Sequence, residues 1–137
     1  MRSAPRPEPG TRNAVVIDDT ALMALGAGNQ VMSRLVVAAH GGPGRYVYAP
    51  AMCVAAAVAR RPRLGDHVGS LLAIHVVDLG FDGARAAGVL IAEGADWRHA
   101  HAVAAARPSP EWPTGLPVVT AAPDACSGHD IEVISLT

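Results

Sequence analysis

Two adjacent carboxylates, Asp18 and Asp19, follow the short apolar run AVVI at residues 14–17. Such a run is typical of a buried parallel strand, and the carboxyl ends of parallel strands form the edge at which α/β proteins bind ligands. Oxygen side chains that precede an apolar helical pattern also cap helices, because they accept hydrogen bonds from unpaired backbone N–H groups. The pair therefore has two interpretations, as half of a metal site or as the start of a helix.

Polar side chains elsewhere in the chain bear on the first interpretation. Thr120 ends a second apolar run, so it falls at the same edge as the carboxylate pair. His99 and His101 are two residues apart in a helical pattern, so they point about 200° apart and cannot share one metal ion. Cys126 and His129 have the spacing of metal ligands. No second pair accompanies them, so we do not expect a zinc site there.

The elements that must hold these residues alternate along the chain. Apolar runs predict strands over 14–18, 45–50, 73–79, 116–122 and 130–136. Spacings of three and four residues predict helices over 20–39, with a break at 26–28, and over 51–61, 64–72, 81–94 and 95–107. Residues 123–130 form a turn-rich connection, and the helix over 81–94 carries one stripe of Phe81, Ala84, Gly88 and Ile91. This alternation predicts an α/β fold with a mostly parallel central sheet.

Length and charge narrow the class of protein. A chain of 137 residues suits one domain, and a formal net charge of −1 gives no overall attraction to nucleic acid or to a membrane surface. No apolar run approaches the roughly 20 residues that span a bilayer. Residues 1–13 are polar and proline-rich, which predicts a disordered tail and no signal peptide. Two cysteines suit a reducing compartment, so we expect a cytoplasmic protein without membrane contact.

The single basic cluster is RRPR at residues 60–63. Arg60, Arg61 and Arg63 have two interpretations. They are a solvated helix end, where cations oppose the helix dipole, or a contact for RNA.

Four segments together give the chain a resemblance that covers residues 14–136. In chain order they are VVIDDTALMAL, YAPAMCVAAAVARR, GADWRHAHAVAAA and the ending GLPVVTAAPDA with DIEVISL. They resemble the motifs of the PIN domain, the fold of the ribonuclease toxins of VapC-type toxin–antitoxin pairs. The resemblance implies a three-layer α/β/α sandwich over residues 14–137.

PIN nucleases gather three or four carboxylates around Mg²⁺ or Mn²⁺, which activates water and stabilises the phosphoryl transition state. Position by position, the resemblance leaves Asp18 as the first acid. The other acidic positions fall on Ala56, His99 and Ala122. Asp19 stands where relatives have a threonine, so we interpret it as a helix cap.

Two further acids and two threonines complete the candidate site. Asp96 and Asp124 match flanking acids of some relatives and are candidate metal ligands beside the first acid. Asp96 is also a candidate helix cap. Thr20 is expected to cap the helix that starts near residue 21, and Thr120 to orient Asp18 by a hydrogen bond.

These residues support two functions of different classes. The favoured one is a catalytically degenerate PIN-like domain that needs no cofactor and serves as a binding or regulatory module. Its partner would be RNA or a protein, such as an antitoxin-like or DNA-binding regulator, and relatives predict a homodimer. The alternative is a ribonuclease in which Asp18, Asp96 and Asp124 hold Mg²⁺ or Mn²⁺ and His99 acts as ligand or base. Whether the chain is an enzyme stays open at this point.

Overall fold

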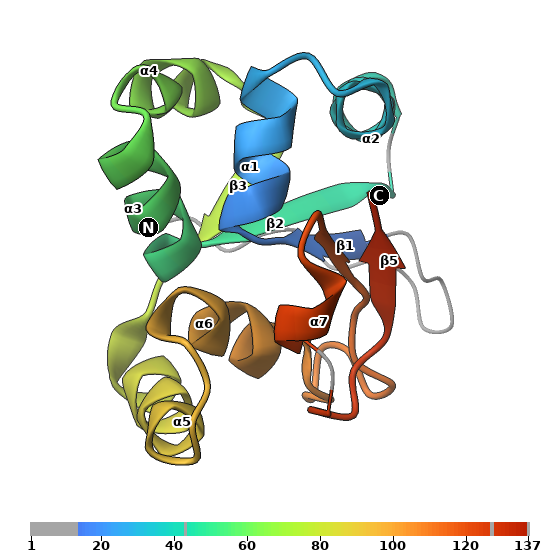
Figure 1. The fold of residues 1–137 in the computed structure, drawn as a ribbon. Coiled ribbons are helices and arrows are strands. Elements are labelled where there is room, and N and C mark those ends of the chain that lie inside the picture. Colours follow the sequence, from blue (N-terminus) through green and yellow to red (C-terminus); the bar gives the residue numbers. More distant parts are fainter. Residues whose placement is uncertain (1–13, 43, 127, 137) are drawn as a thin grey trace.

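A computed structural model describes residues 14–42, 44–126 and 128–136 of the chain (Figure 1). The tail predicted over 1–13 lies outside the described residues. No single helix among the described residues is long and apolar enough to cross a membrane; one bent pair of helices, Asp19–Gly26 with Gln30–Gly41, passes by length and composition only.

Five parallel strands form the central sheet. They are β1 (Ala14–Ile17), β2 (Tyr46–Pro50), β3 (Ile74–Val77), β4 (Val118–Thr120) and β5 (Val133–Ser135). Their order is β3-β2-β1-β4-β5, and all four pairings are parallel. β1 lies at the centre because its residues are apolar on both faces, as a strand covered on both sides requires. The predicted α/β fold with a parallel sheet is confirmed.

Seven helices accompany the sheet in the described part of the chain. They are α1 (Asp19–Gly26), α2 (Gln30–Gly41), α3 (Ala51–Arg60), α4 (Arg63–Ser70), α5 (Gly80–Ala92), α6 (Trp97–Ala106) and α7 (Pro123–Cys126). α1 and α2 lie on one side of the sheet, and α5 and α6 on the other (Figure 1). The arrangement is a three-layer α/β/α sandwich.

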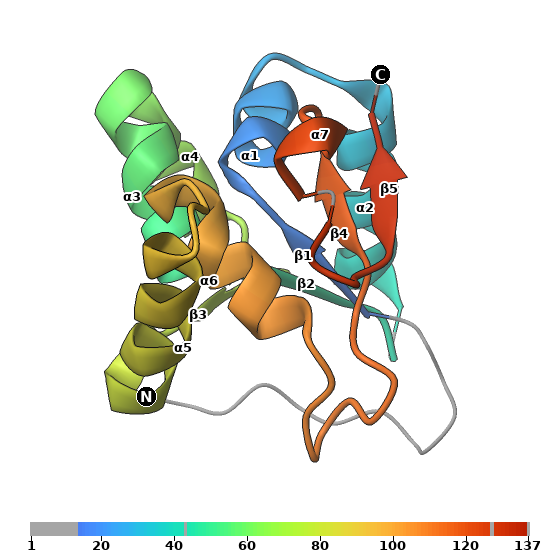
Figure 2. The ribbon, with the colours of Figure 1, turned by 60° about the horizontal axis from the view of Figure 1, so that its bottom comes forward.

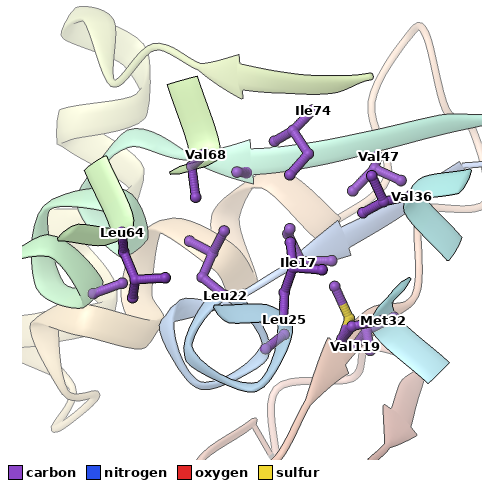
Figure 3. Close-up of a cluster of buried hydrophobic side chains, with 13 residues drawn as sticks. Ile17, Leu22, Leu25, Met32, Val36, Val47, Leu64, Val68, Ile74 and Val119 are labelled. Carbon is purple, nitrogen blue, oxygen red and sulfur yellow. The ribbon is translucent and has the colours of Figure 1, made fainter. Parts of the chain in front are cut away.

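The two faces of the sheet pack differently because successive strand residues point to opposite sides. Ile17, Val47 and Val119 meet Leu22 and Met32 of the α1–α2 side (Figure 3). On the opposite face the strand residues meet mainly small side chains of α6, so that helix lies close to the sheet; the cluster includes Val16, Tyr48, Val118, Ala102 and Ala106. This close approach brings α6 beside the carboxyl end of β1.

α6 lies between α5 and the sheet (Figure 1), and the two helices lie side by side (Figure 2). Ala87 and Leu90 of α5 pack on Ala100 and Val103 of α6. The stripe singled out in the sequence is therefore not the packing face of α5. All four of its residues are exposed, and Phe81 is 76% exposed.

Two differences from the sequence-based expectation lie next to the end of the central strand. The turn-rich connection after β4 contains the short helix α7. The first helix begins at Asp19 and not near residue 21. The predicted break at 26–28 is confirmed, and Asn29 caps the second helix by accepting a hydrogen bond from the Met32 N–H at 3.1 Å.

Candidate functional site

The carboxyl ends of β1 and β4 define the site. The chain passes from β1 to β2 on one side and later returns to β4 on the other, and ligands of open α/β sheets bind where the strand order reverses in this way. Asp18 directly follows β1, and Thr120 is the last residue of β4. The two residues predicted to meet at this edge are brought together there.

Asp18 caps α1. Its backbone is extended, with φ −90° and ψ −175°, and its Oδ1 accepts hydrogen bonds from the Ala21 N–H at 2.9 Å and the Thr20 hydroxyl at 2.7 Å. The prediction that Asp19 and Thr20 are the caps is therefore wrong. Only Asp18 lies between the strand and the helix, so Asp18 takes the cap and Asp19 is the first residue of the helix.

Thr20 and Thr120 join the two strand ends through their hydroxyls. Thr20 Oγ1 lies 3.1 Å from Thr120 Oγ1 and accepts a hydrogen bond from the Ala121 N–H at 2.8 Å. Thr120 Oγ1 in turn accepts one from the Ala122 N–H at 2.9 Å. Both threonines thus support Asp18: the Thr20 hydroxyl donates a hydrogen bond to its carboxylate, and the Thr120 hydroxyl contacts it as well.

His99 of α6 closes the site over the carboxylates. Its Nδ1 lies 3.5 Å from Asp18 Oδ2 and 3.8 Å from Asp19 Oδ1. Both carboxylates are 0% exposed and His99 is 4% exposed. The separations are longer than a good hydrogen bond. Among the described residues, His99 Nδ1, Asp18 Oδ2 and both oxygens of Asp19 are buried without a hydrogen-bond partner.

Opposing effects set the protonation of Asp18 and His99. Burial raises the pKa of Asp18, but the contacts with His99, both threonines and the Ala21 N–H outweigh it and hold that pKa below its usual value. The Asp18 carboxylate raises the pKa of His99 to about 10, Cys126 adds to this rise, and burial opposes it. An imidazolium beside a carboxylate is therefore the favoured metal-free state at neutral pH.

The buried Asp18 carboxylate also affects the pKa values of Asp19 and Cys53. Burial and the neighbouring Asp18 carboxylate raise the pKa of Asp19. Burial also raises the pKa of the Cys53 thiol, and the two carboxylates add to that rise. The Cys53 thiol donates a hydrogen bond to the Arg98 carbonyl at 3.1 Å. Cys53 is therefore a protonated, satisfied core residue.

Cys126 is the site residue that the sequence did not assign. One ligand atom each of Asp18, His99 and Cys126 lies within 4.8 Å of the other two, and all three residues are buried. The sequence did mark Cys126 as a possible ligand, but paired it with His129. Its neighbours in the group are instead Asp18, which directly follows β1, and His99 of α6, and the position of Cys126 shortly after β4 was the available signal.

Asp96 and Asp124 do not belong to this group of ligand atoms. Asp96 caps α6 by accepting a hydrogen bond from the Arg98 N–H at 3.0 Å, and it forms an exposed ion pair with the Arg98 guanidinium at 2.9 Å. These contacts lower the pKa of Asp96 to about 2. Asp124 is exposed in the first turn of α7. The predicted capping role of Asp96 is confirmed.

The remaining predicted positions lie away from the carboxylates or lack a ligand atom. Ala56 is buried in α3, and Ala122 follows β4 without a polar side chain. The arginines of the basic cluster are exposed at the junction of α3 and α4, where both earlier interpretations still apply: Arg60, Arg61 and Arg63.

The donor set does not fit Mg²⁺. That ion requires near-octahedral coordination by oxygen, with several waters, whereas this cluster offers an imidazole, a thiol and two buried carboxylates. The burial also leaves no exposed carboxylate of the pair for a phosphodiester to approach. No model of a known protein family matches this chain, and no curated protein matches it.

Proposed function

We propose that the chain is a PIN-like domain that has lost the nuclease reaction and serves as a binding or regulatory module. One observation carries the proposal: the carboxylates of Asp18 and Asp19 are fully buried beneath His99. The four sequence segments that resemble the PIN domain, together with the parallel α/β sheet, support the family assignment.

Two features support the loss of the nuclease reaction: the carboxylates are inaccessible to a phosphodiester, and too few acidic side chains surround them. Metal-dependent hydrolysis requires that the scissile phosphate reach ions held by an open group of carboxylates. Here the acidic positions fall on Ala56, His99 and Ala122, and the two carboxylates that stay are out of contact with solvent. His99, whose pKa the Asp18 carboxylate raises to about 10, also lies next to Asp18 at the position where PIN nucleases have a metal-binding acid.

RNA cleavage tests this loss. The full chain is incubated with single-stranded and structured RNA in millimolar Mg²⁺ or Mn²⁺, beside Asp18→Asn as the matched variant. We expect equal, background cleavage from both proteins. Cleavage by the wild-type chain that disappears in Asp18→Asn would contradict the proposal and support the ribonuclease alternative. Three buried carboxylate oxygens without hydrogen-bond partners among the described residues favour that alternative as the second candidate.

The exposed stripe of α5 supports a protein partner. Phe81, Ala84, Gly88 and Ile91 form an uncharged, solvent-exposed surface on the outermost helix. In a twofold contact each copy presents the same surface, so an exposed apolar stripe can pack against the same stripe of a second copy. We therefore place the proposed homodimer contact on this stripe. The exposed arginines at the α3–α4 junction are the corresponding support for RNA as partner.

Sedimentation velocity tests the dimer contact. Phe81→Arg should weaken self-association at least tenfold, because it places a charge in an apolar contact. Leu72→Arg, at another exposed apolar position before β3, is the control and should leave self-association unchanged. A wild-type chain that stays monomeric at high concentration, or equal effects of both variants, would exclude this surface.

A further inference from the structure

Four buried polar atoms without partners require an explanation. A buried polar atom without a hydrogen bond is costly, and a buried charge more so. In the described structure Asp18 Oδ2, Asp19 Oδ1, Asp19 Oδ2 and His99 Nδ1 share this state, and they converge where β1, α1 and α6 meet. The unsatisfied atoms thus form one site.

An ion pair alone does not satisfy this group. The single N–H of His99 Nδ1 faces oxygens of two carboxylates, at 3.5 and 3.8 Å, and forms a short hydrogen bond with neither. Two carboxylates that lie beside each other in a buried place also repel when both are charged. A small cation between the carboxylate oxygens and His99 Nδ1 would give all four unpartnered atoms a ligand contact.

The separations match the edges of a tetrahedral ion. With bonds of about 2.0–2.3 Å to nitrogen, oxygen and sulfur, two ligands of one Zn²⁺ lie about 3.3–3.8 Å apart. The distances from His99 Nδ1 to Asp18 Oδ2 and Asp19 Oδ1 are 3.5 and 3.8 Å. The ligand atoms of Asp18, His99 and Cys126 all lie within 4.8 Å of one another, so none of their separations exceeds such an edge by more than about 1 Å.

We propose that Asp18, His99 and Cys126, with the Asp19 carboxylate beside them, bind one divalent transition-metal ion of the Zn²⁺ class. Imidazole and thiolate select Zn²⁺ over Mg²⁺, since Mg²⁺ prefers oxygen ligands throughout. The ion would fasten the N-terminus of α1 to α6 and to the end of α7. The proposal rests on the unpartnered atoms and not on the loss of nuclease activity, so either can fail alone.

Metal titration of the full chain tests the site. The protein is stripped with a chelator, then titrated with Co²⁺ and Zn²⁺ and followed by absorption and thermal unfolding. We expect one ion per chain, a sulfur-to-cobalt charge-transfer band, and a rise in Tm of about 10 °C at a hundredfold excess of Zn²⁺ over its Kd. Millimolar Mg²⁺ should change neither the band nor Tm.

Two matched pairs of variants locate the ligands. Cys126→Ser should remove the sulfur-to-cobalt charge-transfer band, and His99→Gln should remove the Zn²⁺-dependent rise in Tm. Cys53→Ser and His101→Gln change a buried thiol and a buried imidazole outside the cluster, and should retain both signals. A wild-type chain without the charge-transfer band overturns the proposal, whatever the variants do. So does a band that persists in folded Cys126→Ser.

Discussion

The two sides of α6 each carry a buried histidine, and the surroundings of the two imidazoles are opposite in kind. His101 is buried and satisfied: its Nδ1 accepts a hydrogen bond from the Met52 N–H at 3.3 Å, and the Asp78 backbone contacts the ring. His99, two residues earlier, is equally buried, yet its Nδ1 has no hydrogen-bond partner among the described residues and faces two carboxylates. The His101 imidazole binds backbone groups of neighbouring elements and so stabilises the fold. The His99 imidazole faces two buried carboxylates, which is the arrangement of a binding site.

Removal of His99 should have the largest effect on the metal-free chain. His99→Ala leaves the Asp18 and Asp19 carboxylates buried without a cation, so we expect a loss of about 3 kcal/mol in the free energy of unfolding. Urea unfolding in the presence of a chelator measures it. In the wild-type chain the contribution of His99 is complete below pH 6.5 and is lost as pH rises through about 10. A loss under 1 kcal/mol would mean that the carboxylates are neutral.

His101→Gln should cost about 2 kcal/mol, because it disturbs the buried hydrogen bond to the start of α3. Burial lowers the pKa of His101, against a smaller rise from the Asp78 backbone. The contribution of His101 is therefore present above pH 6.5 and is lost as pH falls below it, opposite to His99. NMR titration of both rings measures this contrast. A His101 that titrates above His99 would reverse the comparison.

Asp19→Asn should stabilise the metal-free chain by about 1 kcal/mol. The substitution removes one of two adjacent buried charges. Neither oxygen of the Asp19 carboxylate has a hydrogen-bond partner in the described structure. Unfolding in urea with a chelator tests this, and the same variant should gain less from added Zn²⁺. A destabilised Asp19→Asn would show that the second carboxylate serves the fold.

Asp96→Ala should have the smallest effect, about 0.5–1 kcal/mol, through loss of the exposed N-cap of the same helix. Asp96→Asn keeps the cap and loses only the ion pair with Arg98, so it should be close to wild type. The pKa of about 2 means that the contribution of the ion pair is present above pH 3.8 and lost as pH falls toward 2. Thermal unfolding at pH 7 and pH 2.5 compares the three proteins.

The sequence predicts the sheet and the two sides of α6 because both follow from local periodicity. Apolar runs identify the strands, and a turn of about 100° per residue separates His99 from His101. The cap of α1 could not be assigned in the same way, since Asp18 and Asp19 are chemically alike and one residue of register decides which enters the helix.

Long-range placement explains the residues that the sequence did not assign. Cys126 joins the site only because α7 returns the chain from the end of β4 to the carboxylates, and no local pattern encodes that direction. The stripe of α5 has the spacing of a packing face, yet Ala87 and Leu90 bury instead, because α6 presents small side chains to them. Apolar periodicity identifies a helix and leaves open which face is covered.

The hydroxyl pair Thr20–Thr120 joins residues 100 positions apart. During synthesis the carboxylates leave the ribosome long before Thr120 and Cys126 exist to meet them. The central strand β1 can pair with β2 early, but its other edge waits for β4. A nascent chain that ends at α6 therefore carries Asp18 and His99 without the partners that complete the site. Assembly of this edge is a late event, because it waits for β4 and α7 to be made.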